Sequence, residues 1–309
     1  MKRLQTFALI LIPAALVLLA APRVIARDQD TPKMVYGTLT DKNSGKVLTD
    51  LKPEELMIFE DNKMRPPTNV VRATAPMSIV MLADTSATAG GAGLDRRSSS
   101  ATAAGDMMHD IRAAFASFAK TMLDANPKNE LALMEFGQAS IMITDFTSDG
   151  DELQKSIMRL NTKPNAASVI MEAIMEASKE LGKRKNARRA IVAINVMPDN
   201  EQSREPANNI MKELAKDQAA FFSVSLQKGD IKNASRGPIL EGFTDKTGGK
   251  RDVLVGQSAL VDQLKNYADI LNAQYEITYN RPAGAPPQLV QWATQRNDVK
   301  IYQSKFPPQ

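Results

Sequence analysis

The chain has 309 residues, one histidine, no cysteine and a formal net charge of +4. Its composition of 43% apolar and 24% charged residues is typical of a globular protein with a sizeable core. The lack of cysteine excludes disulfides, thiol catalysis and a lipid anchor on cysteine, and a single histidine excludes a zinc site built from several imidazoles.

The first 26 residues have the layout of a secretory signal peptide. Lys2 and Arg3 precede an apolar run over 7–21, and the signal ends at Ala26. This run is short for a membrane span. The alternative is a signal that stays uncleaved as an anchor, and only in that case do we expect attachment to a membrane. Cleavage would remove Lys2, Arg3 and Arg23 and lower the net charge from +4 to +1. With so small a positive charge, no nucleic-acid partner is expected. We expect a secreted or periplasmic protein.

Both ends of the mature chain carry candidate strands. These are 35–40, 57–60, 288–294 and 299–303. The N-terminal β-segment, 27–73, is too small to be stable alone. We therefore expect the C-terminal β-segment, 281–309, to pair with 35–63 and complete one small β-domain.

Residues 74–280 alternate strands with helices. The candidate strands are 78–83, 130–136, 141–146, 190–196, 220–226 and 275–279, and the candidate helices are 106–123, 151–160, 168–181, 203–216 and 258–273. This order predicts an α/β fold with a doubly wound, mostly parallel sheet and helices on both faces. Gly137-Gln138 predicts a hairpin at one edge, Ser203 a helix cap, and the basic cluster 183–189 a solvated helix end and loop.

An acidic residue ends the buried strand 78–83. Asp84 is followed by Ser86 and Thr88 at two-residue steps. Sites in doubly wound sheets lie at the carboxyl ends of strands, and these oxygen ligands suit Mg²⁺ or Mn²⁺. The alternative is a turn in which the same residues hydrogen-bond their own backbone.

The segment Asp84-Thr85-Ser86-Ala87-Thr88 resembles the Asp-x-Ser-x-Ser start of the metal-ion-dependent adhesion site (MIDAS) of von Willebrand factor type A (VWA) domains. Further segments resemble those of a bacterial secreted VWA subfamily, namely 47–63, 168–178, 188–200, 240–255 and 271–282. The resemblance implies a VWA fold, which is Rossmann-like, over most of the chain.

The resemblance also implies a site and a partner. The metal ligands would be Asp84, Ser86, Thr88 and Ser168, with Mg²⁺ or Mn²⁺ as the ion. An acidic residue of a partner protein would complete the coordination, and no small-molecule substrate is expected.

The sequence departs from the family pattern at several positions. Val196 stands where a second metal-associated Asp is expected, and a valine cannot bind a cation or its water. Asp199 lies nearby in the chain, and the long loop 89–105 brings Arg96 and Arg97. The resemblance therefore implies a degenerate MIDAS.

Three functions follow from these observations. The first is an extracytoplasmic protein-binding module for adhesion or assembly, which is not an enzyme. The second is a structural domain with a vestigial, metal-free site. A remote third is a phosphohydrolase with Asp84 as nucleophile, but residue 86 is then a serine where an acid/base is needed. His109 lies beside the apolar stripe of a predicted helix, and we expect it to be a surface histidine and not a catalytic base.

Overall fold

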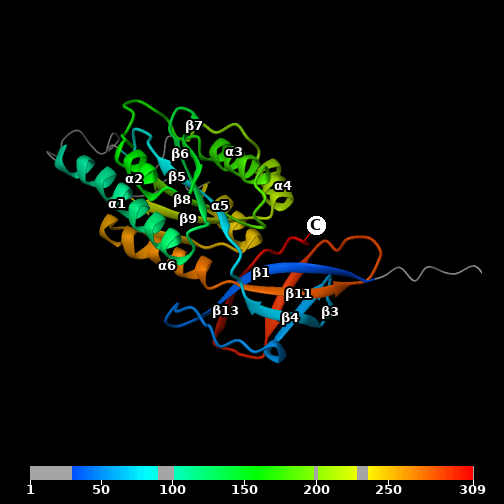
Figure 1. Ribbon diagram of the computed structural model, residues 1–309. Helices are drawn as coiled ribbons and strands as arrows, with labels where there is room; N and C mark the ends of the chain where they lie inside the picture. Colours follow the sequence, from blue (N-terminus) through cyan, green and yellow to red (C-terminus); the bar gives the residue numbers. More distant parts are fainter. Residues whose placement is uncertain (1–29, 90–100, 198–200, 228–235, 309) are drawn as a thin grey trace, which may run out of the picture.

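The computed structural model describes residues 30–89, 101–197, 201–227 and 236–308, without the side chains of 101–106. The predicted signal peptide lies outside the described residues. An α/β domain adjoins a smaller β-domain, and strands from both ends of the chain lie together in the latter (Figure 1).

The main sheet has the strand order β10-β9-β8-β5-β6-β7. Its strands are β5 (Met77–Asp84), β6 (Glu130–Phe136), β7 (Ser140–Thr147), β8 (Arg188–Met197), β9 (Ala219–Gln227) and β10 (Arg251–Leu254). All neighbours pair in parallel except β6 and β7, which form an antiparallel hairpin at the edge. The predicted mostly parallel sheet is confirmed.

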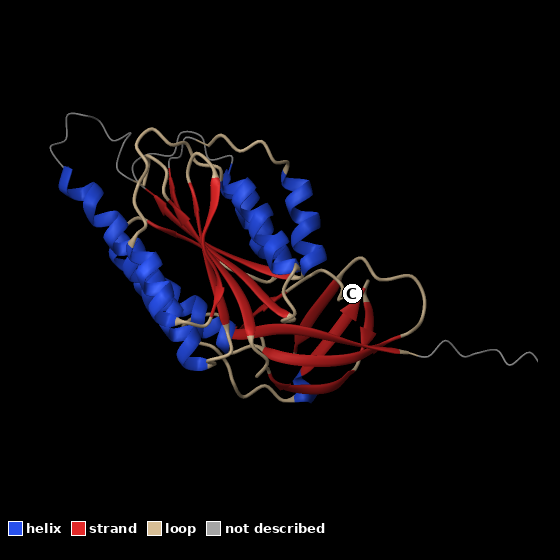
Figure 2. Cartoon of the chain, turned by 45° about the horizontal axis from the view of Figure 1, so that its top comes forward, coloured by secondary structure: helices blue, strands red, loops and turns tan. Residues whose placement is uncertain are grey.

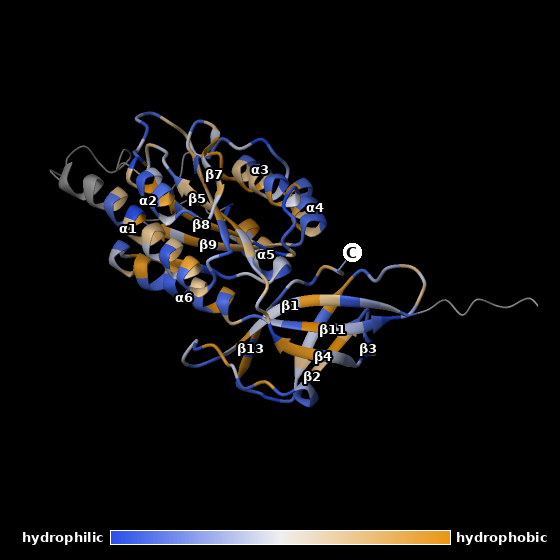
Figure 3. Cartoon of the chain, viewed as in Figure 1, coloured by the Kyte–Doolittle hydropathy of each residue, from blue (hydrophilic) through white to orange (hydrophobic). Residues whose placement is uncertain are grey.

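Helices cover both faces of this sheet (Figure 2). One face packs against α1 (Ala101–Ala125), α2 (Gly150–Met158) and α6 (Leu260–Asn272). The other packs against α3 (Ile170–Gly182), α4 (Ala207–Asp217) and α5 (Arg236–Thr247). Because both faces are covered, the central strand β5 is buried along its whole length and is mostly apolar (Figure 3).

Alternation along β5 decides where its last residue points. Met77, Ile79 and Met81 belong to the core under α1, whereas Val80 and Leu82 belong to the core under α3. Successive side chains of a strand point to opposite faces, so Asp84 continues the row of Val80 and Leu82. Its carboxylate is therefore placed under the helices α3 to α5.

The β-domain is built from two small sheets, with strand orders β13-β1-β11-β4 and β12-β2-β3. Their strands are β1 (Thr31–Asp41), β2 (Leu56–Glu60), β3 (Lys63–Arg65), β4 (Pro67–Arg72), β11 (Tyr275–Arg281), β12 (Val290–Thr294) and β13 (Val299–Gln303); the short helices are η1 (Pro53–Glu55) and η2 (Gln257–Ala259). β13 pairs with β1, and β12 pairs with β2. The predicted β-domain from both ends of the chain is confirmed.

The strand β11 differs from the prediction, which placed it in the α/β domain. It pairs antiparallel with β1 and β4, as in Val35 opposite Ile277. Tyr275, Ile277 and Tyr279 are buried while the residues between them are half-buried. This alternation suits a sheet with one covered face, whereas a strand inside the main sheet is buried on both.

A buried ion-pair cluster lies inside the β-domain. The Glu60 carboxylate accepts hydrogen bonds from Tyr279 Oη (2.7 Å), Arg281 Nε (2.7 Å) and Arg65 Nε (3.1 Å). Burial opposes ionisation of Glu60, but the hydrogen bonds outweigh it and hold the pKa of this carboxyl below its usual range. The cluster joins strands from both ends of the chain.

We expect Glu60→Gln to lower the free energy of unfolding by about 3 kcal/mol at neutral pH, because it breaks a buried pair. A lowered pKa stabilises the fold above the unfolded value, about 4.3, and this contribution is lost as the pH falls below it. Urea unfolding between pH 3 and 7 should therefore show a weaker acid dependence in the variant. Glu54→Gln, at an exposed position, is the control; an equal loss in both variants would contradict the role of the cluster.

The end of α5 joins the two domains. Lys305 N donates to Lys246 O (2.9 Å), and Gly248 has a positive φ of 78°. A Cβ on Gly248 would lie 2.2 Å from the Gln303 carbonyl carbon. Only glycine fits this approach of the C-terminal segment to α5.

Gly248→Ala should lower the free energy of unfolding by about 2 kcal/mol or more, because it adds backbone strain and a clash. Gly242→Ala is the matched control, since a Cβ there meets no atom within 4 Å. Gly242 lies inside α5, so alanine should raise stability by about 0.5–1 kcal/mol. Thermal unfolding of both variants would contradict this account if their midpoints shifted in the same direction.

Candidate functional site at the carboxyl edge of the main sheet

Asp84 is fully buried at the end of β5. Its Oδ1 accepts a hydrogen bond from Ser86 N (2.9 Å), and its Oδ2 accepts one from Val196 N (2.9 Å). Both oxygens are thus held by backbone donors, one from its own turn and one from the neighbouring strand β8. Val196 stands where the family pattern predicts a second Asp. It supports Asp84 through its main-chain N–H.

The turn after Asp84 is tied to the loop before α3. Lys163 N donates to Thr85 O (2.8 Å), and Ala87 N donates to Ala166 O (2.9 Å). Ser86 is buried in this turn, and its Oγ makes no hydrogen bond of normal geometry with a described residue, although it lowers the pKa of Asp84. Thr88 is half-buried further along the turn. We call this edge, formed by residues 84–89, 137–139, 160–168, 201–206 and 236, the crest.

Ser168 is fully buried and joins a third part of the crest. It forms an isolated parallel bridge with Glu201, and Gln202 N donates to Ser168 O (2.9 Å). Ser203, predicted to cap the helix that follows it, instead accepts a hydrogen bond from Met171 N in the first turn of α3 (3.1 Å). That cap prediction is wrong, because α4 begins only at Ala207.

Arg236 is the crest residue that the sequence analysis missed. It is the first residue of α5 and is 5% exposed. Its Nη2 donates to Ser168 Oγ (3.0 Å) and forms an ion pair with Glu201. One local signal could have located it, because Pro238 two residues later predicts a helix start, and such helices begin at this edge of a parallel sheet.

The pKa of Asp84 is raised above its usual range, and burial is the main cause. The hydrogen bonds from Ser86 and Val196 and the positive charge of Arg236 act in the opposite direction. A carboxylate without these partners would be costly at full burial. The crest therefore compensates Asp84 with groups from the chain itself.

These groups do not suit a divalent cation well. Both Asp84 oxygens already accept hydrogen bonds, Ser168 Oγ accepts one from a cation, and a fixed positive charge lies beside them. Among the described residues, no group of three or more His, Cys, Asp or Glu side chains could hold a metal ion. The ligand set Asp84, Ser86, Thr88 and Ser168 for Mg²⁺ or Mn²⁺ stays a prediction, and the geometry argues against it.

Other predicted contributors fall into two classes. Asp199, Arg96 and Arg97 lie outside the described residues. Asn195 lies on the same face of the sheet as Asp84, since it continues the row of Ile191 and Ala193. Its Oδ1 accepts hydrogen bonds from Ser223 Oγ and Ser225 Oγ of β9 (3.1 Å each). A fully buried Asp84 also fits poorly with a phosphohydrolase nucleophile, which must reach a substrate. The side chain of His109 is exposed on α1.

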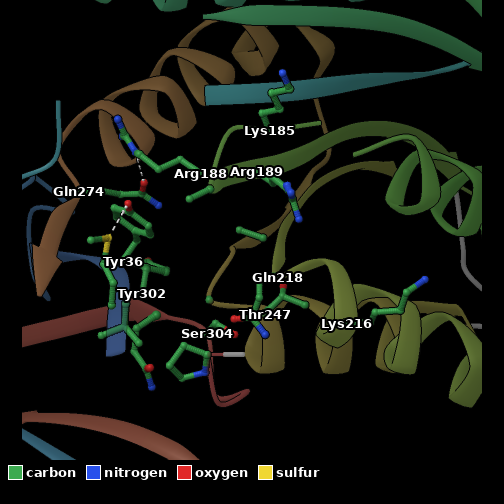
Figure 4. A pocket seen from close by; sticks show the side chains of 17 residues that line it. Tyr36, Lys185, Arg188, Arg189, Lys216, Gln218, Thr247, Gln274, Tyr302 and Ser304 are labelled. Carbon is green, nitrogen blue, oxygen red and sulfur yellow. Dashed lines mark hydrogen bonds between the residues drawn. The ribbon is translucent and has the colours of Figure 1, made fainter. Parts of the chain in front are cut away.

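A basic hollow of about 340 Å³ lies between the two domains, at the start of β8, whereas the crest lies at the end of this strand (Figure 4). The Arg188 guanidinium there donates to Gln274 Oε1 (3.0 Å), Ala75 O (2.6 Å) and Leu271 O (2.7 Å). Burial is the main cause that lowers the pKa of Arg188 to about 10. Arg188 is thus buried and links the start of β8 to the segments that contain Ala75, Leu271 and Gln274. The prediction of a solvated loop is wrong at this residue.

Arg189, which also lines the hollow, is held by the chain in the same way. Its guanidinium donates to Asn186 O (2.9 Å), Asp217 O (2.9 Å) and Arg184 O (2.6 Å). Because carbonyl oxygens of the chain take three of the five N–H donors of each arginine, the hollow presents little of either guanidinium to a ligand. Its arginines hold the domains and loops together.

Comparisons with known proteins agree with the fold. Residues 79–195 match the family model of the von Willebrand factor type A domain. No curated protein matches the chain. A von Willebrand factor type A protein from Catenulispora acidiphila is 10% identical, with 91% of this chain and 74% of that chain covered and a TM-score of 0.50.

Proximal thread matrix protein 1 from the mussel byssus, solved with zinc in its MIDAS motif, is 9% identical and has a TM-score of 0.51. The match covers 69% of this chain and 49% of that chain. At such identities the likeness shows a shared fold alone. None of the described helices is long and apolar enough to cross a membrane.

Asp84→Ala should lower the free energy of unfolding by about 3 kcal/mol, because it leaves two buried N–H groups without an acceptor. Asp149→Ala is the matched control. Asp149 also accepts two backbone hydrogen bonds, from Asp151 N and Glu152 N, but at an exposed helix start. Its loss should cost only about 1 kcal/mol. Equal losses in urea unfolding would contradict the structural role of the buried carboxylate.

Proposed function

Because residues 79–195 of this chain form a von Willebrand factor type A domain, we propose that the protein is a binding module that holds another protein through the crest of its main sheet. The predicted signal peptide supports an extracytoplasmic role in adhesion or assembly. The resemblance to VWA proteins supports an interaction role without catalysis.

The observation that supports this proposal most directly is that the crest loops are hydrogen-bonded to one another. The turn after β5 is hydrogen-bonded to the loop before α3, and that loop is hydrogen-bonded to the segment after β8. Loops held in this way lose little conformational entropy when a partner binds. Exposed polar side chains, Gln138, Asn165 and Gln202, lie on this ordered edge.

A structural domain with a vestigial site is the second candidate. One observation favours it, namely that Asp84 and Ser168 are satisfied within the chain. Such a domain would not need its crest to be accessible. The two functions therefore differ in what the crest contacts in the cell.

A photo-reactive amino acid at Gln138 should form a discrete covalent adduct with another protein in the producing cells. Excess unlabelled protein should suppress this adduct, because it competes for the same partner. The same label at Gln291, an exposed glutamine of β12 in the β-domain, is the matched control. We expect at least a tenfold weaker adduct there. Equal adducts at both positions, or none at Gln138, would contradict a crest-bound partner.

A further inference from the structure

Three crest groups from separate parts of the chain interact with one guanidinium. Arg236 donates to Ser168 Oγ (3.0 Å), pairs with Glu201, and acts electrostatically on Asp84. The arginine is 5% exposed and the Glu201 side chain is 24% exposed. The cation therefore lies inside the crest, and its carboxylate partner lies towards the surface.

The charge balance of this cluster depends on Arg236. Asp84 and Glu201 supply two carboxylates, and Arg236 supplies one fixed positive charge beside them. A divalent cation added to this set would leave an excess positive charge in a poorly solvated place. Without Arg236, the same ion would be balanced by the two carboxylates.

The ligand atoms follow the same logic. Ser168 Oγ faces a donor of Arg236, and both Asp84 oxygens face backbone N–H groups. Ser86 Oγ is the other buried hydroxyl of the predicted set, and a neutral hydroxyl supplies no charge to balance a cation. A planar guanidinium can contact several oxygens at once and keeps its charge at any physiological pH, which suits it to this position.

We propose that the Arg236 guanidinium is a built-in cation that takes the place of a divalent metal ion at the crest, with Glu201 as the carboxylate that closes the site. The inference rests on the proposed function only in treating the crest as the surface that binds a partner protein. It adds that binding there is independent of divalent metal. The chain thus carries a MIDAS-like turn whose cation is part of the fold.

The test is a titration of Mn²⁺ alone, followed by the electron paramagnetic resonance signal of the free ion. The full wild-type chain should leave this signal unchanged at millimolar Mn²⁺. Arg236→Gln should bind one Mn²⁺ per chain, and its thermal midpoint should rise by about 3 °C at several times the dissociation constant. Adding Glu201→Gln to this variant should abolish both effects.

Two control variants separate charge from general destabilisation. Arg251→Gln removes another largely buried arginine, which donates to Ser225 Oγ (3.2 Å), and should gain no Mn²⁺. Arg236→Lys keeps the charge and should also gain none. The wild type alone tests the proposal if Arg236→Gln does not fold.

One Mn²⁺ per wild-type chain, lost in Ser168→Ala, would overturn the proposal. So would a folded Arg236→Gln that binds no Mn²⁺. Partner binding is not part of this measurement. The metal inference and the proposed function can therefore fail separately.

Discussion

The structure depends on how the buried carboxylate of Asp84 is satisfied. Full burial of a charge is costly unless hydrogen bonds and an opposite charge accompany it. Asp84 receives N–H groups from its own turn and from β8, and the charge of Arg236 lies nearby. These partners come from distant parts of the chain, so satisfying one side chain draws together β5, β8 and α5.

The same requirement shapes the crest. Ser168, between the turn and the segment after β8, accepts a hydrogen bond from Arg236, while Glu201 pairs with that cation from the surface side. Each of these contacts is supplied by the chain itself. The cluster leaves an ordered polar edge, which is what a protein-binding surface needs if little entropy is to be lost on association.

The β-domain gives the α/β domain a second support. Strands from both chain ends close around Glu60, which is hydrogen-bonded to Arg65, Tyr279 and Arg281. Thr38 Oγ1 of β1 also donates to Ile270 O of α6 (2.6 Å). The β-domain thus packs against the base of the main domain, at the other end of the strands from the crest.

Local patterns determined the fold class and the motif. The alternation of strands and helices, the hairpin at Gly137 and the acid after β5 could all be predicted, because each depends on residues close in sequence. Only the tertiary structure decided that β11 joins the β-domain, that Ser203 caps α3, and that Arg236 lies beside Ser168. These contacts join segments far apart in the chain, and no local periodicity encodes which distant group satisfies a buried charge.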